Sequence, residues 1–153
     1  MSFFIGNCEA KTDAKGRVFL PSVYRRLLPD GERGRVVMRM DPENECLVLY
    51  PEGVWNRMVE ELQGRLDEWD AEDRLLLMQF VSDAEWMDID SQGRILIQKR
   101  FLSAIGAGQT LLFVGMIDRI AVWGKERYES AKMGREDFAR RLASKMKGAK
   151  DGE

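Results

Sequence analysis

The chain has 153 residues, 44% hydrophobic and 33% charged, a composition typical of a globular protein. It contains no run of about 18 or more apolar residues, so we expect no membrane span. The absence of histidine excludes catalytic and metal sites built on imidazole. Two distant cysteines, Cys8 and Cys46, predict neither a disulfide framework nor a zinc site, and we interpret them as small hydrophobic side chains.

Charge is distributed unevenly along the chain, whose net charge is −2. Residues 1–40 hold eight basic and four acidic side chains, residues 41–90 hold three and fifteen, and residues 91–153 hold thirteen and seven. A nucleic-acid partner would therefore contact the first or last third, because the middle third repels phosphates. The apolar start of the chain lacks the basic region of a signal peptide, and we expect a cytoplasmic protein.

An internal repeat organises the sequence. Residues 13–20 align with residues 90–97, and both segments contain the pattern D-x-x-G-R followed by an apolar strand. Residues 47–50 and 120–123 then follow in the same order, each as an apolar strand that ends in an aromatic residue. The predicted division is into a first repeat (1–66), an acidic linker helix (67–83), a second repeat (84–135) and a polar tail (136–153).

In chain order, the first repeat predicts a strand at 7–12, the D-x-x-G-R turn, an exit strand at 17–20, a short helix at 23–28, strands at 36–40 and 46–50 around a turn at 41–44, and a helix at 51–66. Asp at the first position of a type I turn and Gly at the fourth, where φ can be positive, favour a hairpin with a bulge.

The linker predicts a helix over 67–81 with a wide apolar face, which we expect to pack between repeats or subunits. The second repeat predicts strands at 85–89 and 94–97, a helix at 100–105, strands at 110–114 and 120–123 around a turn at 115–118, and a helix at 125–133. The tail favours a marginal amphipathic helix, with disorder in its last residues.

Neither repeat is large enough to bury a good core alone, and each hairpin leaves open edges. We therefore predict that the two repeats interleave their hairpins into one barrel. Association of several chains side by side would then bury the apolar faces that remain.

The paired motifs resemble those of the MraZ family. The resemblance rests on Asp13, Gly16 and Arg17, on Asp90, Gly93 and Arg94, and on flanking stretches such as residues 4–6 and 46–51, and it covers about residues 3–133. It implies an α+β fold, mainly β: a pseudo-twofold double swapped-hairpin (AbrB-like) barrel with flanking helices. It also implies a ring-shaped homo-oligomer, an octamer or a dodecamer, that acts in the cytoplasm in association with the nucleoid.

The resemblance further implies a sequence-specific transcriptional regulator. Its target would be double-stranded DNA with G-rich direct repeats, in the promoter of the division and cell-wall gene cluster that includes its own gene. The turn and exit strand would enter the major groove, where a two-stranded ribbon fits and an arginine can bond O6 and N7 of one guanine. The predicted DNA-binding residues are Arg17, Arg94, Lys15, Gln92, Lys11 and Lys99, and the predicted turn-structuring residues are Asp13, Gly16, Asp90 and Gly93.

The same residues allow a structural interpretation, in which each Asp–Arg pair only staples its turn. Both roles are compatible if the aspartate orients the arginine for a base. Arg25, Arg26 and Arg100 follow the exit strands, and we interpret them as solvated or subunit-interface residues rather than base contacts.

Two other classes of function stay open. The chain could be a protein-interaction module acting on an enzyme encoded beside it, which an apolar patch left exposed on the linker helix would favour. An enzyme would have to use Asp88 and Asp90, which have neither a base nor a metal-binding partner, so we predict that the chain is not an enzyme. No catalytic residue, metal, cofactor, small-molecule substrate or membrane partner is predicted.

Overall fold

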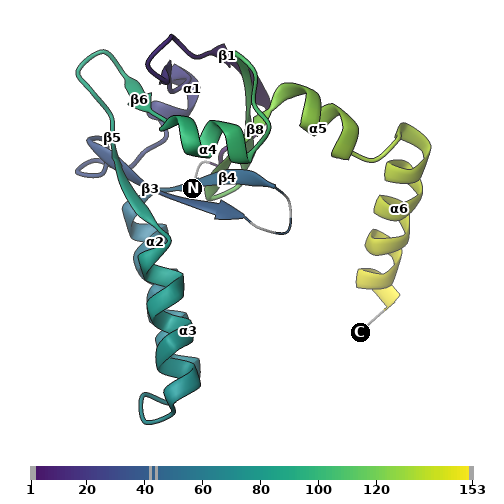
Figure 1. Cartoon of the computed structure of the whole chain (residues 1–153). Coiled ribbons are helices and arrows are strands. Elements are labelled where there is room, and N and C mark those ends of the chain that lie inside the picture. The colour runs from purple at the N-terminus through teal and green to yellow at the C-terminus, as the bar shows by residue number, and fades with distance from the viewer. Residues whose placement is uncertain (1–2, 42, 44, 152–153) are drawn as a thin grey trace.

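The computed structural model describes residues 3–41, 43 and 45–151 and shows an α+β fold built on antiparallel strands (Figure 1). The strands are β1 (Asn7–Lys11), β2 (Arg17–Phe19), β3 (Arg35–Asp41), β4 (Cys46–Tyr50), β5 (Glu85–Asp88), β6 (Arg94–Leu96), β7 (Thr110–Met116) and β8 (Arg119–Gly124). The helices in this part of the chain are α1 (Ser22–Arg25), α2 (Glu52–Arg65), α3 (Ala71–Ser82), α4 (Lys99–Ala104), α5 (Lys125–Ala131) and α6 (Arg135–Asp151).

The two repeats interleave, as predicted. One sheet has six strands in the order β1-β7-β8-β4-β3-β5, and a second, two-stranded sheet pairs β2 with β6. The hairpins β3–β4 and β7–β8 stay within their own repeats and meet through β4 and β8. The outer strands are exchanged, because β1 of the first repeat pairs with β7 and β5 of the second repeat pairs with β3. Neither repeat therefore forms a sheet of its own.

The hairpin predicted around each D-x-x-G-R motif is confirmed at the turn, but its strands do not continue as a pair. Beyond the bond from the Asp13 N–H to the Arg17 carbonyl oxygen, at 2.9 Å, β1 and β2 diverge to partners in the second repeat. The second turn has the same single bond, from the Asp90 N–H to the Arg94 carbonyl oxygen. The exchange lets Val18 and Ile95 face each other across the β2–β6 ribbon, with 1% of each side chain exposed. Burial of these central residues explains why the exit strands pair between repeats.

The six-stranded sheet buries side chains on both faces. On one face, the β2–β6 ribbon and the short helices α1 and α4 cover a cluster that includes Leu20, Tyr24, Ile97 and Phe113. On the other face, α2 and neighbouring residues cover a cluster centred on Trp55. The ribbon is thus held against the core by its inner side chains, which leaves its outer face available.

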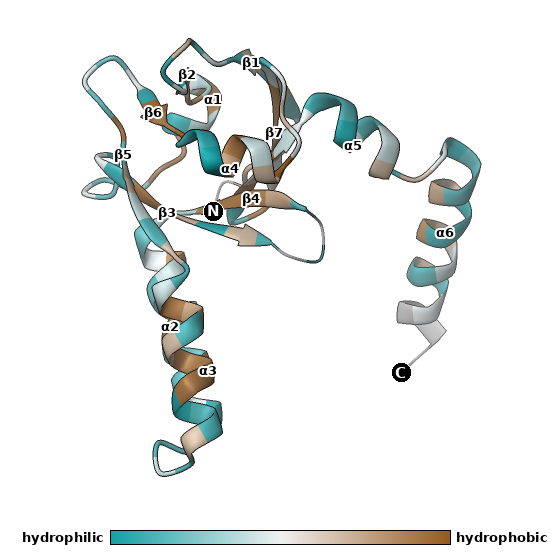
Figure 2. Cartoon of the chain, in the orientation of Figure 1, coloured by the Kyte–Doolittle hydropathy of each residue, from teal (hydrophilic) through white to brown (hydrophobic). Residues whose placement is uncertain are grey.

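The linker prediction is partly confirmed. The helix begins at Ala71 rather than at residue 67, because the Asp70 carboxylate accepts a hydrogen bond from the Asp73 N–H at 3.0 Å and caps it. Helices α2 and α3 form a hairpin that extends away from the sheet (Figure 1), joined by stacking of Trp55 on Phe80 at 5.1 Å between ring centroids. Leu77 is half-buried, whereas Leu75, Leu76, Met78 and Val81 are exposed in the single chain. Figure 2 shows the hydrophobic stretch of α3.

The second hairpin turn is tighter than predicted. Strand β7 runs to Met116 and β8 begins at Arg119, so that only Ile117 and Asp118 form the loop. Ile117 has a φ of 72°, which is rare for a β-branched residue, and it is held by a reciprocal pair of backbone hydrogen bonds with Phe4 at 2.8 and 2.9 Å. In the first hairpin, residues 42 and 44 of the predicted turn lie outside the described residues.

The remaining helices are close to their predicted positions. The short helices predicted at 23–28 and 100–105 are α1 and α4, and those predicted at 51–66 and 125–133 are α2 and α5. The tail forms α6, whose Phe138, Leu142 and Met146 are exposed at a spacing of four residues. The disorder expected for the last residues falls at 152–153, which are not among the described residues.

Candidate nucleic-acid interface

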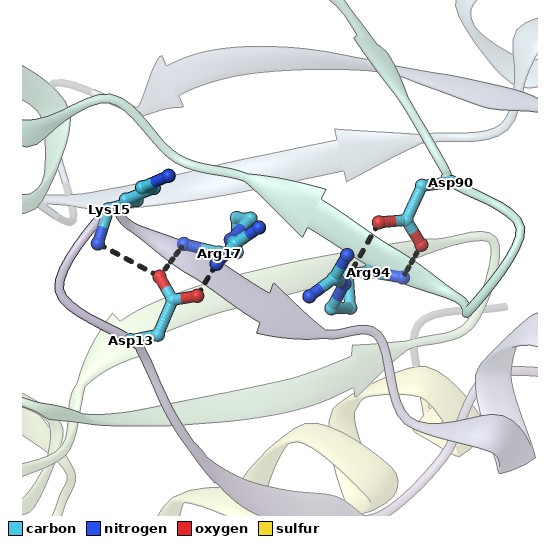
Figure 3. A network of polar contacts seen from close by, with 5 residues as sticks. All are labelled: Asp13, Lys15, Arg17, Asp90 and Arg94. Atoms are coloured by element: carbon cyan, nitrogen blue, oxygen red, sulfur yellow. Dashed lines mark hydrogen bonds and ion pairs between the residues drawn. The ribbon is translucent and has the colours of Figure 1, made fainter.

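The first D-x-x-G-R turn is held together by one aspartate. The Asp13 carbonyl oxygen accepts from the Gly16 N–H at 3.1 Å, and Gly16 has a φ of 91°, as a type I turn followed by a left-handed glycine requires. One oxygen of the Asp13 carboxylate accepts from the backbone N–H groups of Lys15 and Arg17, both at 2.9 Å. The other oxygen accepts from Nε of Arg17 at 2.7 Å (Figure 3).

The second turn repeats this geometry. The Asp90 carboxylate accepts from the backbone N–H of Arg94 at 2.8 Å and from its Nε at 2.9 Å (Figure 3). It also accepts from the backbone N–H of Gln92 at 2.9 Å. Gly93 has a φ of 85°. Because the chemistry is the same in both turns, the repeat extends from the sequence pattern to the position of each side chain.

Both aspartates are held in the charged form. The backbone N–H of Arg17 is the main cause that lowers the pKa of Asp13, followed by the side chain of the same arginine, and Arg94 acts in the same way on the pKa of Asp90. A carboxylate that accepts several N–H bonds is stabilised relative to its protonated form. The aspartates therefore orient the arginines, and they would repel a phosphate rather than bind one.

The two arginines lie on the outer face of the β2–β6 ribbon. Arg17 is opposite Leu96 and Arg94 is opposite Phe19, on either side of the buried pair formed by Val18 and Ile95. Because side chains alternate along a strand, all four flanking residues point away from the core. Nε of each arginine donates to its aspartate. In the described part of the chain, the two Nη groups of each arginine form no hydrogen bond with another acceptor. They can donate together to one acceptor edge.

The other predicted DNA-binding residues are exposed but are not all brought together. Lys15 and Gln92 lie in the two turns beside the arginines. Lys11 ends β1 on the six-stranded sheet, opposite Thr110. Lys99 begins α4, two residues after Ile97, whose N–H donates to the Gly16 carbonyl oxygen at 2.9 Å. Lys11 and Lys99 therefore lie outside the two turns, on β1 and α4.

The position of the arginines that follow β2 was not predicted from the sequence. Arg25 donates from Nε to the Leu20 carbonyl oxygen at 2.9 Å, and its guanidinium lies so close to Gly93 that a Cβ there would be 2.6 Å from Cζ. The side chains of Arg25, Arg26 and Arg33 line an open hollow of about 270 Å³ beside the second turn. The fold thus carries three cations of the first repeat to the turn of the second. Local sequence could not have located them, because only the exchange of strands between the repeats brings them to this turn.

Among the described residues, the first turn has no matching group of arginines from the second repeat beside its glycine. A Cβ at Gly16 would collide with the carbonyl oxygen of Ile97, so backbone rather than a cation covers this glycine. Arg100, which follows the second exit strand, instead pairs with Glu85 at 3.2 Å and lies over the Phe101 ring. The two turns are therefore alike in their Asp–Arg pairs and different in their surrounding charge.

The described residues give no support to an enzyme site. The Asp90 carboxylate is occupied by its own turn, and Asp88 lies in β5 opposite Arg35. No group of three or more His, Cys, Asp or Glu side chains is placed to hold a metal ion in the part of the chain described. Burial, with a smaller effect of the Asp41 charge, raises the pKa of Cys46 to about 12, as expected for a small hydrophobic side chain rather than a nucleophile. No helix in the described ranges is long and apolar enough to cross a membrane.

Comparisons with known proteins show the family of this chain. The family described as "MraZ protein, putative antitoxin-like" matches residues 3–78 and again residues 80–146. The chain is 46% identical over 144 residues to "Transcriptional regulator MraZ" of Bacteroides fragilis, covering 94% of this chain and 91% of that protein. It is 43% identical over 152 residues to the protein of the same name from Bacteroides thetaiotaomicron, covering 98% and 97%. Two matches of the family in one chain also account for the internal repeat, and these relatives are regulators rather than enzymes. The chain therefore belongs to the MraZ family.

Proposed function

We propose that this MraZ-type transcriptional regulator binds double-stranded DNA with the outer face of the β2–β6 ribbon, and that Arg17 and Arg94 read guanines in the major groove. The observation that carries the proposal is the fixation of Nε of each arginine by its aspartate at 2.7 and 2.9 Å, which leaves the two Nη groups of each arginine to donate elsewhere. A bidentate arginine is the commonest specific contact to guanine, and a two-stranded ribbon fits the groove. The aspartates and glycines of the turns hold this geometry and do not touch DNA.

The surrounding cations supply contacts to phosphates. Lys15 would contact the backbone near the first turn, with Lys11 and Lys99 further out and Gln92 making a weaker, uncharged contact near the second turn. Arg25, Arg26 and Arg33 would replace the missing lysine of the second turn, because they line the hollow beside it. These contacts add affinity and carry no sequence information.

The targets and the assembly follow from the family resemblance. The DNA would be the G-rich direct repeats in the promoter of the division and cell-wall gene cluster, including the chain's own gene, and the protein would act in the cytoplasm at the nucleoid. The repeats 1–66 and 84–135 would close into a barrel, with 67–83 and 136–153 as extensions. Several chains would form a ring, an octamer or a dodecamer, whose head-to-tail subunits suit direct repeats in DNA.

Fluorescence anisotropy tests this proposal. DNA from upstream of the chain's own gene is titrated against scrambled DNA of equal length at about 150 mM salt, which is close to physiological screening. We expect tight binding to the upstream fragment alone, and loss of that preference in Arg17→Ala and Arg94→Ala with an unchanged circular dichroism spectrum. Equal, weak binding to both fragments, or unchanged preference in the two variants, would reject the site.

One observation favours a second candidate, a protein-interaction module. Leu75, Leu76 and Met78 are exposed on α3, which extends away from the sheet (Figure 2). An exposed apolar patch can mark an interaction site, and an enzyme encoded by a neighbouring gene would be the partner. The purified enzyme should then bind the wild-type chain and not Leu75→Asp/Met78→Asp, while both forms keep the DNA preference. Equal binding of the enzyme to both forms, or to neither, would reject this candidate.

A further inference from the structure

Two large apolar side chains lie uncovered on the same face as the arginines. Phe19 is 54% exposed and Leu96 is 52% exposed, although the residues next to them in the strands, Val18 and Ile95, are almost fully buried. The pattern along each strand is therefore not that of a surface strand with polar outer residues. Single exposed hydrophobic residues are common on proteins, so exposure alone assigns no role to these two.

The register of the two strands places each of these apolar residues beside an arginine. Phe19 is the direct cross-strand partner of Arg94, and Leu96 is that of Arg17. Directly opposed residues of an antiparallel pair have Cβ atoms about 4.5–5.5 Å apart. Consecutive bases of a DNA strand are about 3.4 Å apart. An apolar side chain beside each arginine would therefore reach a base pair within one or two steps of the guanine that the arginine bonds.

Only one group at that distance suits an apolar side chain. In the major groove, the base edges present hydrogen-bond donors and acceptors, except for the 5-methyl group of thymine. A phenylalanine or leucine placed against any other edge would remove water from a polar group without replacing its hydrogen bond. Contact with a thymine methyl buries two apolar groups instead.

The charges around the pair favour DNA over a second protein as the occupant of this face. Arg17 and Arg94 lie opposite the two apolar residues, and Lys15 extends from the first turn. Arg25 and Arg26 line the hollow beside the second turn. A polyanion offers acceptors to the Nη groups of the two arginines and to Lys15 at once, whereas an apolar protein surface would cover these charges without adding an acceptor.

We propose that Phe19 and Leu96 contact thymine methyl groups, so that each Arg–apolar pair reads a G·C pair together with a T·A pair one or two steps away. This rests on the proposed function, because it requires the ribbon to lie in the major groove. The two units differ, Arg94 with Phe19 and Arg17 with Leu96, and the larger ring covers more of the methyl group. Sequence preference therefore extends beyond guanine, to the thymines nearby.

The test removes only the methyl group. The upstream fragment is made once with thymine and once with uracil at every thymine position, and anisotropy measures binding of the wild-type protein to both. We expect uracil to weaken binding about fourfold for each contacted methyl, the factor given by roughly 0.8 kcal/mol per buried carbon group. The Phe19→Ala/Leu96→Ala double variant should bind the thymine fragment more weakly than the wild type and should not distinguish the two fragments.

A matched control keeps the comparison specific. Leu142→Ala removes a leucine of similar exposure, 50%, from α6 and should keep the full response to uracil. Circular dichroism and thermal unfolding establish that the double variant is folded.

Equal binding of the wild type to both fragments would overturn the proposal, and so would an equal loss in wild type and double variant, which would indicate a change in DNA shape. The double variant could instead change in molecular mass and still bind the uracil fragment more weakly than the thymine fragment. That result would assign Phe19 and Leu96 to a contact between chains. These outcomes leave the proposed function standing if the upstream fragment is still preferred over scrambled DNA. If the wild type shows no preference for the upstream fragment over scrambled DNA, the proposed function itself is rejected.

Discussion

At the scale of single residues, the aspartate of each turn has two separable tasks. One oxygen of Asp13 accepts backbone N–H groups and shapes the turn, while the other fixes Arg17 at 2.7 Å. Asn can still accept the backbone bonds but cannot form the ion pair. Asp13→Asn should therefore lower the preference for upstream over scrambled DNA and leave the melting temperature nearly unchanged.

The matched variant Asp13→Ala removes both tasks. It should lose the DNA preference and also lower the melting temperature, because two backbone N–H groups lose their acceptor. Anisotropy and thermal unfolding separate the two effects. Identical binding by wild type and Asp13→Asn would show that the ion pair does not orient Arg17 for a base.

The cations beside the second turn should act on affinity without reading sequence. Arg26 is exposed and lines the hollow with Arg25 and Arg33. Arg26→Ala should weaken binding to all DNA sequences alike and flatten the slope of log affinity against log salt by about one. Arg100→Ala is the control, since Arg100 is paired with Glu85 away from this hollow. A change in sequence preference, or an equal effect in the control, would contradict a phosphate contact.

The titratable groups of the interface predict that DNA affinity does not change with pH near neutrality. The chain has no histidine, and the pKa values of Asp13 and Asp90 are lowered from 3.8. Because these values are lowered, the contribution of each charged carboxylate is present above 3.8 and is lost only as pH falls through the lower folded value. Anisotropy at constant salt should give the same affinity from about pH 5 to pH 8. A transition inside that window would show a titrating group that this interface does not contain.

At the scale of elements, an aromatic stack ties α3 to α2. Phe80 lies on Trp55 and under the guanidinium of Arg39, which is 4.6 Å from the ring centroid. Phe80→Ala would uncover Trp55 and should lower the free energy of unfolding by roughly 1–3 kcal/mol, less than for a fully buried ring. Gln79→Ala, at an exposed polar position of the same helix, should change it by less than about 0.5 kcal/mol.

Urea unfolding at one protein concentration measures both variants, since association with other chains would stabilise the fold by mass action. A similar loss in the two variants would show that α3 is held by contacts other than the stack. An unchanged stability in Phe80→Ala would show that α3 does not need the stack.

The elements also show what local sequence can predict. The turn geometry was predictable, because Asp13, Gly16 and Arg17 interact within five consecutive residues and their spacing fixes the hydrogen bonds. The partner of β1 was not predictable from its own residues, because an alternating strand can pair with either neighbour. β1 pairs with β7 of the second repeat, and burial of Val18 against Ile95 accounts for the pairing of β2 with β6.

The same distinction applies to the candidate interface. The arginines of the two motifs could be selected from the sequence, and their role in DNA binding stays a prediction. The position of Arg25 against Gly93 could not be selected, because 68 residues separate them and only the exchange of strands between repeats brings them together. Phe19 and Leu96 follow the alternation of a strand, but the sequence does not show which face is covered.

At the scale of the whole molecule, the distribution of apolar surface predicts self-association. The exposed hydrophobic residues of α3 and α6 lie on two extensions that leave the sheet on different sides (Figure 1). Large contiguous apolar patches are rare on the surfaces of monomeric proteins. Head-to-tail contacts between such extensions close into a ring when the rotation between subunits allows it. Static light scattering should therefore give a mass that is a large multiple of the 17.6 kDa chain, whereas a monodisperse monomer would reject the ring.

Assembly and DNA recognition can be separated by one comparison. Several ribbons on one ring would engage several DNA repeats as linked sites, so their affinities multiply through effective concentration. If the α3 face is a subunit contact, Leu75→Asp/Met78→Asp should reduce the mass and should weaken binding to DNA with many repeats far more than binding to a single repeat. Arg17→Ala should do the reverse, keeping the mass and losing single-repeat binding. A smaller mass with undiminished binding to many repeats would show that one chain suffices, and the ring would then have no part in recognition.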